Sequence, residues 1–366
     1  MPEVKLVNVT KRYGNIVAND NINLTINDGE YVSVIGPSGC GKTTLIKNIS
    51  GIIKPDEGEI YIAGNLVNEV SIEDRGIGYV FQNIALFPHM TVWENITYGP
   101  AVKGWSPEKT NPLALEMLEL IKLSARSDAY PSELSGGTQQ KTAVARALTS
   151  RAELLILDEP LGALDVKVRT ELRYELRKLV KDLGLTALHI THDQEEAMSI
   201  SDRVIVMKRG RIVEVGNPID LYTKPKNIFT ANFVGEANFL TGIILKISDD
   251  ESLIEIGDGL RLLTKTGNYN VNDRVVVAFR PEFAYITHVK MGNTLSGIIT
   301  EVIYSGNIGR VRMKLSNGDP IVIKMALGIK NHQFHLNDNI TINILPENIL
   351  VYPYPEKGLE MELALE

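Results

Sequence analysis

The sequence has almost no cysteine and no long hydrophobic run. Its 366 residues include a single cysteine, Cys40, which excludes an internal disulfide and suits a reducing compartment. No apolar run approaches the ~18 residues that a membrane-spanning helix needs, so we expect any role at a membrane to depend on a partner protein. The first residues, Met1–Lys5, lack the apolar core of a signal peptide, and none is expected there.

An excess of positive charge is also absent. The chain has 38 Lys and Arg against 45 Asp and Glu, a net charge of −7, which argues against a general nucleic-acid-binding protein because such proteins carry a basic surface. The composition is otherwise that of a globular protein, with 44% hydrophobic and 23% charged residues. A chain of 366 residues exceeds what one hydrophobic core usually serves, so two domains are expected.

A phosphate-binding loop stands near the start of the chain. Gly36–Thr44 fits the pattern G-x-x-x-x-G-K-[ST], follows the apolar run Tyr31–Ile35 and precedes the helix-like run Leu45–Ile49. This strand–loop–helix context is the one that the motif requires. Backbone N–H groups and the helix N-terminus bind phosphate. Lys42 is expected to reach the β- and γ-phosphates and Thr43 to ligate Mg²⁺, so the chain is predicted to bind a nucleoside triphosphate.

Two further motifs belong with this loop. The apolar run Leu154–Leu157 ends in Asp158 and Glu159; Asp158 can reach Mg²⁺ through water, and Glu159 can polarise an attacking water. A second loop, Leu134–Lys141, places Ser-Gly-Gly before a predicted helix over residues 138–147, which is another anion-binding end. One active site needs only one such anion-binding end from each chain. The second loop therefore indicates that each site receives this loop from another subunit.

The chain divides into two textures. Residues 1–235 read as an α/β domain with buried parallel strands and intervening helices. In residues 236–366, apolar and polar residues alternate as they do in β-strands, and no convincing long helix is found. This second part holds an internal repeat: Leu240–Ile244 is echoed by Leu295–Ile299, and residues 272–282 are echoed by residues 337–347. Because small duplicated β-units usually share one core, the repeat predicts an all-β domain of paired barrels.

These motifs together resemble the nucleotide-binding subunit of an ABC transporter. Leu134–Lys141 resembles that family's signature, Gly36–Thr44 its Walker A motif and Leu154–Glu159 its Walker B motif. Further family marks follow in order: Tyr13, which would stack on adenine, Gln82, which would sense Mg²⁺ and water, Leu161–Asp165, which would face a second subunit, and His192, which would contact the γ-phosphate. The resemblance covers about residues 1–235 and implies the P-loop ABC-type ATPase fold.

The resemblance also implies a set of site residues. Catalysis would fall to Gln82, Glu159 and His192, and Mg²⁺ to Thr43, Gln82 and Asp158. ATP would contact Tyr13, Ser38, Gly39, Cys40, Gly41, Lys42, Thr43 and Thr44 of one copy and Ser135, Gly136, Gly137 and Gln139 of the other.

The β-rich tail indicates to which branch of the ABC family the chain is similar. With Arg280–Glu282, it resembles the duplicated, oligonucleotide-fold-like regulatory (TOBE) domain of importers for sugars, polyamines, iron or oxyanions. Arg280 and Glu282 are expected to form a structural ion pair rather than a ligand site. The run Gly235–Leu240 resembles the polyamine and iron branches slightly more than the sugar branch.

The expected protein is therefore an ATP-hydrolysing motor subunit that works as a homodimer at the cytoplasmic face of the membrane. The resemblance implies ATP and Mg²⁺ as cofactors, two transmembrane permease subunits as partners, an extracytoplasmic solute-binding protein as an indirect partner, and no nucleic acid. Phe87–Met90 and Trp93 are expected to form the socket for a short permease helix, with ordinary core packing as the alternative for Phe87 and Trp93.

The sequence departs from the importer branch at two positions of the signature, and two other classes of protein were weighed. The importer branch usually has Gln at the position of Thr138 and Arg at that of Lys141, and Lys141 keeps the charge but loses the planar fork. A soluble ABC ATPase acting in a non-transport process usually carries coiled-coil insertions or two fused cassettes, whereas this chain has one cassette and a β-tail. A small-molecule P-loop kinase would explain neither Ser135–Gly137 nor the duplicated tail.

Overall fold

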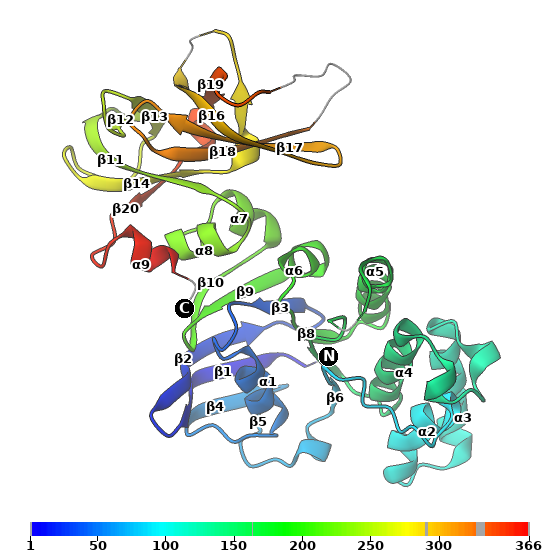
Figure 1. Ribbon diagram of the computed structural model, residues 1–366. Helices are drawn as coiled ribbons and strands as arrows, with labels where there is room; N and C mark the ends of the chain where they lie inside the picture. Colours follow the sequence, from blue (N-terminus) through cyan, green and yellow to red (C-terminus); the bar gives the residue numbers. More distant parts are fainter. Residues whose placement is uncertain (1, 163, 290–291, 327–333, 365–366) are drawn as a thin grey trace. The chain divides into compact units, whose positions relative to one another are not determined.

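The computed structural model describes residues 2–162, 164–289, 292–326 and 334–364 (Figure 1). The chain forms two compact units that divide between Asp220 and Leu221. The first is α/β and the second is dominated by strands, which confirms the predicted fold class. Residues 221–235, which the sequence texture assigns to the first domain, fall in the second unit.

The first unit contains two sheets. The smaller has the strand order β2-β1-β4-β5 and the larger the order β10-β9-β3-β8-β7-β6. The strands of the smaller sheet are β1 Val4–Tyr13, β2 Ile16–Ile26, β4 Glu57–Ile62 and β5 Asn65–Leu66. Those of the larger are β3 Tyr31–Ile35, β6 Ile77–Val80, β7 Leu154–Asp158, β8 Thr186–Ile190, β9 Arg203–Lys208 and β10 Arg211–Gly216.

Helices cover the larger sheet on both faces. The helices of this unit are α1 Lys42–Ser50, α2 Val92–Val102, α3 Pro107–Leu120, α4 Gly136–Thr149, α5 Val166–Asp182 and α6 Gln194–Ile200, and α7 Pro218–Thr223 contains the division between the units. Short 3-10 helices lie at Ile72–Asp74, Ser124–Arg126 and Pro131–Glu133. Helix α5 is capped by the Asp165 side chain and buries Leu172, Leu176 and Val180.

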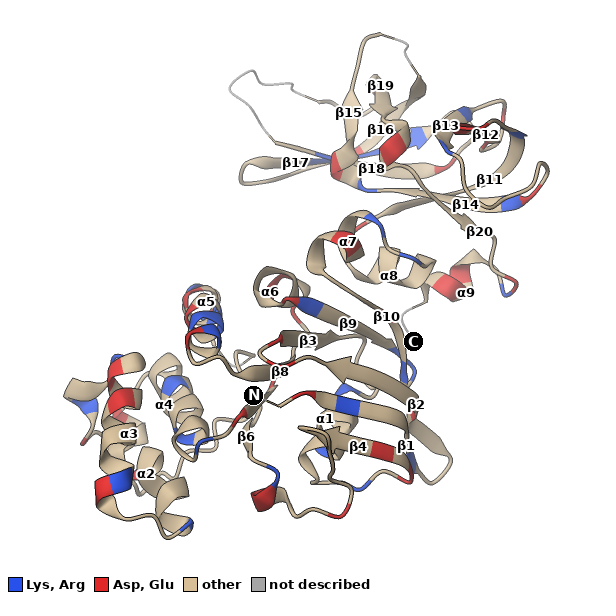
Figure 2. Cartoon of the chain, turned by 180° about the vertical axis from the view of Figure 1, so that it is seen from behind, with Lys and Arg blue, Asp and Glu red and all other residues tan. Residues whose placement is uncertain are grey.

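The continuous apolar runs of the sequence become the central strands because both of their faces are buried. Every residue of β3, β7 and β8 is buried, and β3 and β8 carry no Lys, Arg, Asp or Glu, so they are drawn tan in Figure 2. One face packs with α1 and the smaller sheet in a core that includes Leu45, Ile156 and Leu188. The other face packs with the helices α2 to α5, in a core that includes Leu155 and Leu157.

The second unit is built from two five-stranded antiparallel sheets that share one core. One sheet has the order β13-β12-β11-β14-β20 and the other the order β15-β19-β16-β17-β18. The strands are β11 Asn238–Ile247, β12 Glu251–Glu255, β13 Arg261–Lys265, β14 Arg274–Phe279, β15 Ala284–Ile286, β16 Asn293–Ser305, β17 Ile308–Leu315, β18 Pro320–Ala326, β19 Asn339–Ile344 and β20 Leu350–Pro353. Two helices, α8 Ile228–Phe233 and α9 Leu359–Leu363, and two 3-10 helices, Pro281–Phe283 and Pro346–Asn348, complete it.

The structure confirms the internal repeat at the level of register. Leu240 of β11 lies opposite Val277 of β14, and the equivalent Leu295 of β16 lies opposite Ile342 of β19. The two copies also hold each other. The amide of the buried Asn238 pairs with the backbone of Val322, and that of its counterpart Asn293 pairs with the backbone of Leu263, so each asparagine bridges from its own sheet to the other.

Arg280 is structural, but not through the expected ion pair with Glu282. Its guanidinium is 1% exposed and donates to the carbonyl oxygens of Tyr222, Ala231 and Glu236, while Glu282 accepts from the Tyr222 hydroxyl. Buried carbonyls of the segment before β11 need donors, and the five N–H groups of an arginine can supply several at once. Arg280 therefore ties this segment to the β-unit.

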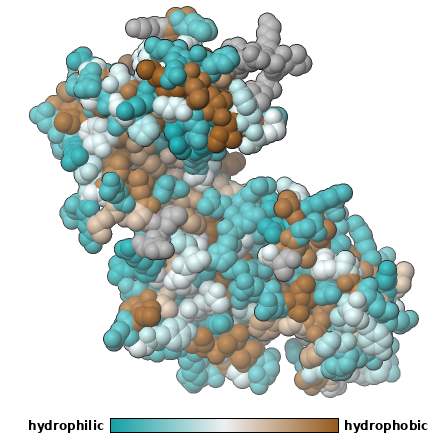
Figure 3. Space-filling model, viewed as in Figure 1, coloured by the Kyte–Doolittle hydropathy of each residue, from teal (hydrophilic) through white to brown (hydrophobic). Residues whose placement is uncertain are grey.

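The surface is mixed in character. In the space-filling view, separate hydrophobic patches are surrounded by hydrophilic side chains (Figure 3). Among the described residues, no helix is both long enough and apolar enough to span a membrane.

Candidate functional site

Four neighbouring parallel strands bring the predicted motifs to one edge of the larger sheet. In the order β3, β8, β7 and β6, the strands are followed by the phosphate loop, His192, Glu159 and Gln82. The carboxyl ends of parallel strands meet at the same edge, which is where open α/β sheets bind their ligands. Segments more than a hundred residues apart in the chain therefore meet at this edge.

The phosphate loop depends on glycine for its close contacts. Gly41 caps α1 in the left-handed region, with φ +103, and a Cβ atom there would lie 2.1 Å from the carbonyl oxygen of Ala18. Gly36 follows β3, and a Cβ atom would lie 2.4 Å from the carbonyl oxygen of Met207. Any side chain at either position would displace backbone, so the loop keeps its path only with glycine.

The loop holds its lysine in place. The Lys42 ammonium donates to the carbonyl oxygens of Gly36 and Pro37, at 2.7 and 3.0 Å, and lies 3.8 Å from Cys40 Sγ. Burial raises the pKa of the Cys40 thiol, against the opposing charge of Lys42. Cys40 is 4% exposed, so it acts here as a small buried residue, and no thiolate is favoured despite the nearby helix N-terminus.

A cavity of about 450 Å³ opens beside this loop. Its walls include six predicted nucleotide-binding or metal-binding residues, Ser38, Gly39, Gly41, Lys42, Thr43 and Thr44, and two predicted catalytic residues, Glu159 and His192. Ile16–Ala18, Arg209 and Gly210 also line it. The sequence reasoning missed these five residues because they come from a hairpin and a turn that carry no motif. No sequence signal places Arg209 beside the phosphate loop, because the two are far apart in the chain.

Of the three predicted catalytic side chains, Gln82 and His192 each contact Glu159. Gln82 Nε2 donates to Glu159 Oε2 at 2.8 Å, and His192 Nε2 lies 2.5 Å from Glu159 Oε1. Glu159 has a positive φ of +47, and its backbone N–H donates to the Ile190 carbonyl at the end of β8. This bond fixes the loop after β7 against its neighbouring strand. The Glu159 carboxylate, 14% exposed, therefore lies between a hydrogen-bond donor and an imidazole at the edge of the cavity.

Asp158 lies one residue earlier and in a different setting. Its carboxylate is 7% exposed and accepts a hydrogen bond from the Tyr79 hydroxyl at 3.0 Å. Burial raises the pKa of Asp158, partly offset by that hydrogen bond, and burial followed by the Asp158 charge raises the pKa of Tyr79. A desolvated carboxylate gains from a nearby cation. The oxygen donors of Thr43, Gln82 and Asp158 are the kind that Mg²⁺ prefers, and Mg²⁺ usually takes one or two protein carboxylates together with phosphate oxygens.

The signature residues lie apart from this cavity. Ser135 caps α4 by accepting from the Thr138 backbone N–H, and its hydroxyl lies 2.8 Å from that of Thr138. Ser135 and Gly136 are exposed, and neither they nor Gly137 lines the cavity. The Gln139 side chain donates to the carbonyls of Pro131 and Leu134 and so braces the loop before the helix.

The remaining predicted positions have distinct settings. The Lys141 ammonium pairs with Glu175 of α5 at 2.5 Å, so the charge that replaces the usual arginine has a partner. Tyr13 ends β1, is 45% exposed and does not line the cavity, although it pairs with Ile16, which does. Ala163, in the loop expected to face a second subunit, lies outside the described residues.

Comparison with known families agrees with both halves of the chain. The ABC transporter family profile matches residues 19–162, and the TOBE domain profile matches residues 264–351. The first match contains the phosphate loop, the signature and the Asp158–Glu159 pair, and the second lies within the duplicated β-unit.

Curated relatives match over nearly their whole length. The spermidine/putrescine import ATP-binding protein PotA of Legionella pneumophila is 36% identical over 360 residues, which cover 96% of this chain and 99% of the relative. The sulfate/thiosulfate import ATP-binding protein CysA of Halalkalibacterium halodurans is 37% identical over 362 residues, with 97% and 99% covered. A dimeric bacterial ABC transporter cassette of known structure is 37% identical, covers 59% of this chain and 98% of its own, and has a TM-score of 0.53.

Proposed function

Because this chain belongs to the import ATP-binding subunits of the ABC transporter family, we propose that it powers the uptake of a polyamine through separate permease subunits. It binds and hydrolyses ATP. The observation that carries the assignment of chemistry is the contact of Gln82, Glu159 and His192 at the edge of the cavity that the phosphate loop lines. The roles of individual residues in ATP binding and hydrolysis belong to the same proposal.

The phosphate loop would bind the triphosphate. The N-terminus of α1 presents unpaired backbone N–H groups and partial positive charge to the cavity. Lys42, now donating to two loop carbonyls, would exchange them for phosphate oxygens, which accept charge-assisted hydrogen bonds more strongly. Arg209 adds a second positive charge to the wall. Thr43, Asp158 and Gln82 would hold Mg²⁺, which when bound would neutralise charge on the β- and γ-phosphates.

Glu159 would position the attacking water. A carboxylate between the Gln82 amide and the His192 imidazole is held in one orientation, and a held base is what proton abstraction from water requires. His192 would contact the γ-phosphate and, through Glu159, report its presence. Catalysis of this kind relies on position and electrostatics, because phosphoryl transfer needs little covalent chemistry from the protein.

A second copy of the chain would complete each site. Ser135 and Gly136 lie exposed at the N-terminus of α4 and outside the cavity of their own chain, so they are free to meet the γ-phosphate of a partner's ATP. Two bound ATP molecules would then favour the closed dimer, and hydrolysis would release it. The bacterial ABC transporter cassette of known structure that this chain resembles is dimeric, which supports a dimer here.

The permease contact is proposed at the loop before α2. The buried Asn95 side chain bonds to the backbone of Phe87, Met90 and Thr91, which fixes the shape of this loop. The Phe87 ring contacts that of Tyr98 at 4.4 Å and is half-buried, while His89 is exposed. A fixed loop that offers both apolar and polar groups suits a short helix of the permease. The chain would accordingly lie at the cytoplasmic face of the membrane, with an extracytoplasmic solute-binding protein supplying the cargo and no nucleic acid involved.

Polyamine is proposed as the cargo on two grounds. Relatives named for spermidine and putrescine recur at 36 to 40% identity, and Gly235–Leu240 resembles the polyamine and iron branches slightly more than the sugar branch. The relative named for sulfate and thiosulfate is equally similar at 37%, so the alternative is tested beside it. A soluble ATPase without a permease remains the competing class.

Uptake measurements separate these outcomes. The chain would be produced with the permease and binding-protein genes that neighbour its own, in cells lacking endogenous polyamine and sulfate uptake. We expect labelled putrescine or spermidine to enter with the native chain and not with Lys42→Ala. Uptake of sulfate alone would overturn the cargo, and ATP hydrolysis without uptake of any of the three would favour the soluble class.

A further inference from the structure

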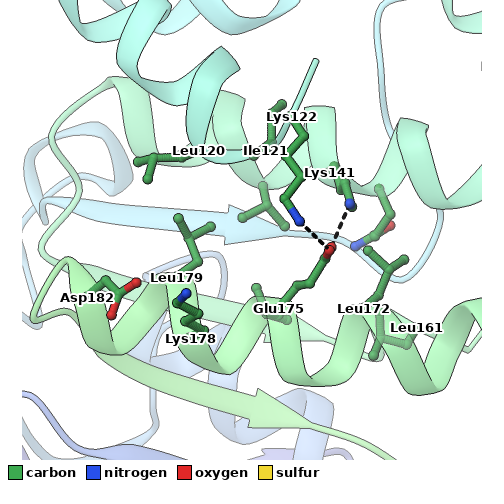
Figure 4. A pocket seen from close by; sticks show the side chains of 13 residues that line it. Leu120, Ile121, Lys122, Lys141, Leu161, Leu172, Glu175, Lys178, Leu179 and Asp182 are labelled. Atoms are coloured by element: carbon green, nitrogen blue, oxygen red, sulfur yellow. Dashed lines mark hydrogen bonds and ion pairs between the residues drawn. The ribbon is translucent and has the colours of Figure 1, made fainter. Parts of the chain in front are cut away.

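A second cavity lies within the first unit, away from the phosphate loop. Its volume is about 180 Å³. One wall is the stripe Leu172, Leu176 and Leu179 of α5, and the other is formed by Val144 of α4 and Ile121 at the end of α3. Figure 4 shows the side chains of Leu172 and Leu179 directed from α5 toward α4 and the end of α3.

The cavity opens to solvent at one side. Leu120 is 40% exposed, and the side chains of Lys122 and Glu175 are 77% and 41% exposed. Leu161, Leu172 and Leu176, at 1%, 6% and 7%, form the buried part. A ligand could therefore enter between Leu120 and the charged side chains and lie against the leucines.

One buried polar side chain lines this apolar space without a hydrogen-bond partner. Gln140 of α4 is 2% exposed, and among the described residues neither its Nε2 nor its Oε1 has a hydrogen-bond partner. Burying such groups unpaired is costly, and buried polar atoms in folded proteins almost always find partners. Because Gln140 lines the cavity, a ligand that supplies one donor and one acceptor would give both of these atoms a partner.

Two of the lysines that line the cavity, Lys122 and Lys141, are already paired. Lys122 lies 3.4 Å from Glu175 Oε1 and Lys141 lies 2.5 Å from Glu175 Oε2, as the dashed lines in Figure 4 mark. These two lysines hold the pKa of Glu175 below its ordinary value, although partial burial opposes the shift. Lys178 and Asp182 also line the cavity, and both are exposed. A charged ligand lying against the leucines would have to lose its hydration or displace one of the Glu175 pairs, whereas an uncharged ligand would do neither.

We propose that this cavity is a binding site for a small uncharged molecule with an apolar body and a primary carboxamide. The amide of such a ligand and that of Gln140 can form two reciprocal N–H···O=C hydrogen bonds, satisfying both orphan atoms at once. The size also fits, because a leucine-lined cavity of ~150 Å³ accommodates a benzene ring. An aromatic carboxamide such as benzamide therefore combines the right body and the right polar group.

The site lies on the helix that carries the signature. Gln140 follows Gly136 and Gly137 by four and three residues, so all three lie on one face of α4. At that end the contact with α5 is tight: a Cβ atom on Gly137 would lie 2.7 Å from Val168 and 3.3 Å from Leu172. The two helices touch at the signature end and enclose the cavity farther along, so an occupant bears on the placement of Ser135–Gly137. This second step, an effect on ATP hydrolysis, rests on the proposed function.

Binding is tested on the full-length chain with benzamide as the probe, by calorimetry and by NMR. Toluene, which keeps the apolar body without the amide, and benzoate, which adds a charge, are the comparison ligands. We expect saturable binding of benzamide and weaker binding of the other two. The side-chain amide signal that disappears in Gln140→Leu should shift when benzamide is added. Absence of saturable benzamide binding would mean that the cavity holds only water and would overturn the site.

Three variants locate the binding. Gln140→Leu should lower benzamide affinity by at least about tenfold, since two hydrogen bonds are lost, and should keep or improve toluene binding. Because this change removes an unpaired buried amide, the variant should melt at or above the native temperature. Leu179→Trp should fill the cavity and abolish binding of both ligands. The matched control, Leu115→Trp, changes an exposed leucine of α3 that does not line the cavity. Equal benzamide affinity in all four proteins would refute the site.

The effect on hydrolysis is measured separately. Saturating benzamide should change the ATPase rate of the native chain at least about twofold and leave that of Gln140→Leu unchanged. An unchanged native rate at full occupancy would refute the coupling to the signature helix while leaving the binding site. A chain that binds benzamide but never hydrolyses ATP would instead refute the proposed function.

Discussion

Replacing Glu159 by glutamine tests the proposed chemistry with the smallest change in shape. Glutamine keeps the length of the side chain and can still accept a hydrogen bond from Gln82 through its carbonyl oxygen. It loses the negative charge, and with it the attraction to His192 at 2.5 Å and the ability to take a proton from water. The backbone of the residue, fixed by its N–H bond to Ile190, should not change.

The size of the effect follows from the role of the carboxylate. A positioned general base contributes about 10²- to 10⁴-fold to a rate, which at about 1.36 kcal/mol per tenfold change corresponds to roughly 2.7 to 5.4 kcal/mol of transition-state stabilisation. ATP affinity should be equal or higher, because the variant removes a negative charge from the wall of a cavity that would hold phosphates. We therefore expect kcat to fall by that factor with no rise in the Kd for ATP.

The assay compares phosphate release and ATP binding in the native chain, in Glu159→Gln and in the control Glu116→Gln, which alters an exposed glutamate of α3. With hydrolysis blocked, Glu159→Gln should also elute as a dimer on a sizing column in the presence of Mg²⁺ and ATP. Turnover within a few-fold of the native rate would show that Glu159 is not the base. A matching loss in Glu116→Gln would point to a general effect of removing charge.

Three further expectations follow. His192→Ala should lower kcat by about a hundredfold with a modest change in ATP affinity, because its γ-phosphate contact would matter most in the transition state; a pure rise in KM would contradict that role. His189, fully buried and bonded to the Tyr31 hydroxyl, has its pKa lowered by burial to about 3. The unfolded chain therefore binds the extra proton below about pH 6.5, and the stability that native His189 contributes relative to His189→Gln should shrink as the pH falls, by about 1.4 kcal/mol per pH unit; a pH-independent difference in denaturant titrations would refute it. A chain truncated after Asp220 should stay folded and hydrolyse ATP. A chain truncated after Gly235 should be less soluble, because Ile228 and Ala231 lose the strand residues on which they pack. Light scattering measures the solubility of both truncated chains and ATPase assays their activity; a folded, dimeric but inactive Asp220 truncation would assign the tail to catalysis.

The motifs were enough to predict that Glu159 and His192 lie at the cavity beside the phosphate loop, because each of the three follows an apolar strand. They could not predict the order of those strands. His192 meets Glu159 because β8 lies between β3 and β7, an arrangement set by packing on both faces of the sheet rather than by any local pattern. Ile16–Ala18, at the start of β2, and Arg209, in the turn between β9 and β10, line the cavity from segments that carry no motif.

In the second unit, too, local patterns in the sequence predicted the elements but not the contacts between sheets. Its repeat was visible as two matched pairs of segments, and the register of the strands confirms it. The reciprocal bonds of Asn238 and Asn293 were not visible, since an asparagine at the start of a strand has no pattern that names a partner in another sheet. The change of texture near Gly235 marks where strands begin. The compact units divide earlier, at Asp220, because α8 packs on β14 and β20 and Arg280 bonds to the preceding segment. Residue 235 as the limit of an independently folding domain stays a prediction.

The central claim is that two copies of the chain build each ATP site, and a mixture of two inactive variants tests it most directly. Lys42→Ala disables the phosphate loop, and Ser135→Arg disables the exposed signature end of α4. In a mixed dimer, one site would carry both defects and the other neither. Half of a random mixture is heterodimer with one intact site of two, so with independent sites we expect about a quarter of native turnover to return. Exchange of subunits is verified with two affinity tags. Turnover no higher than that of either variant alone, in a mixture shown to contain the heterodimer, would contradict the claim.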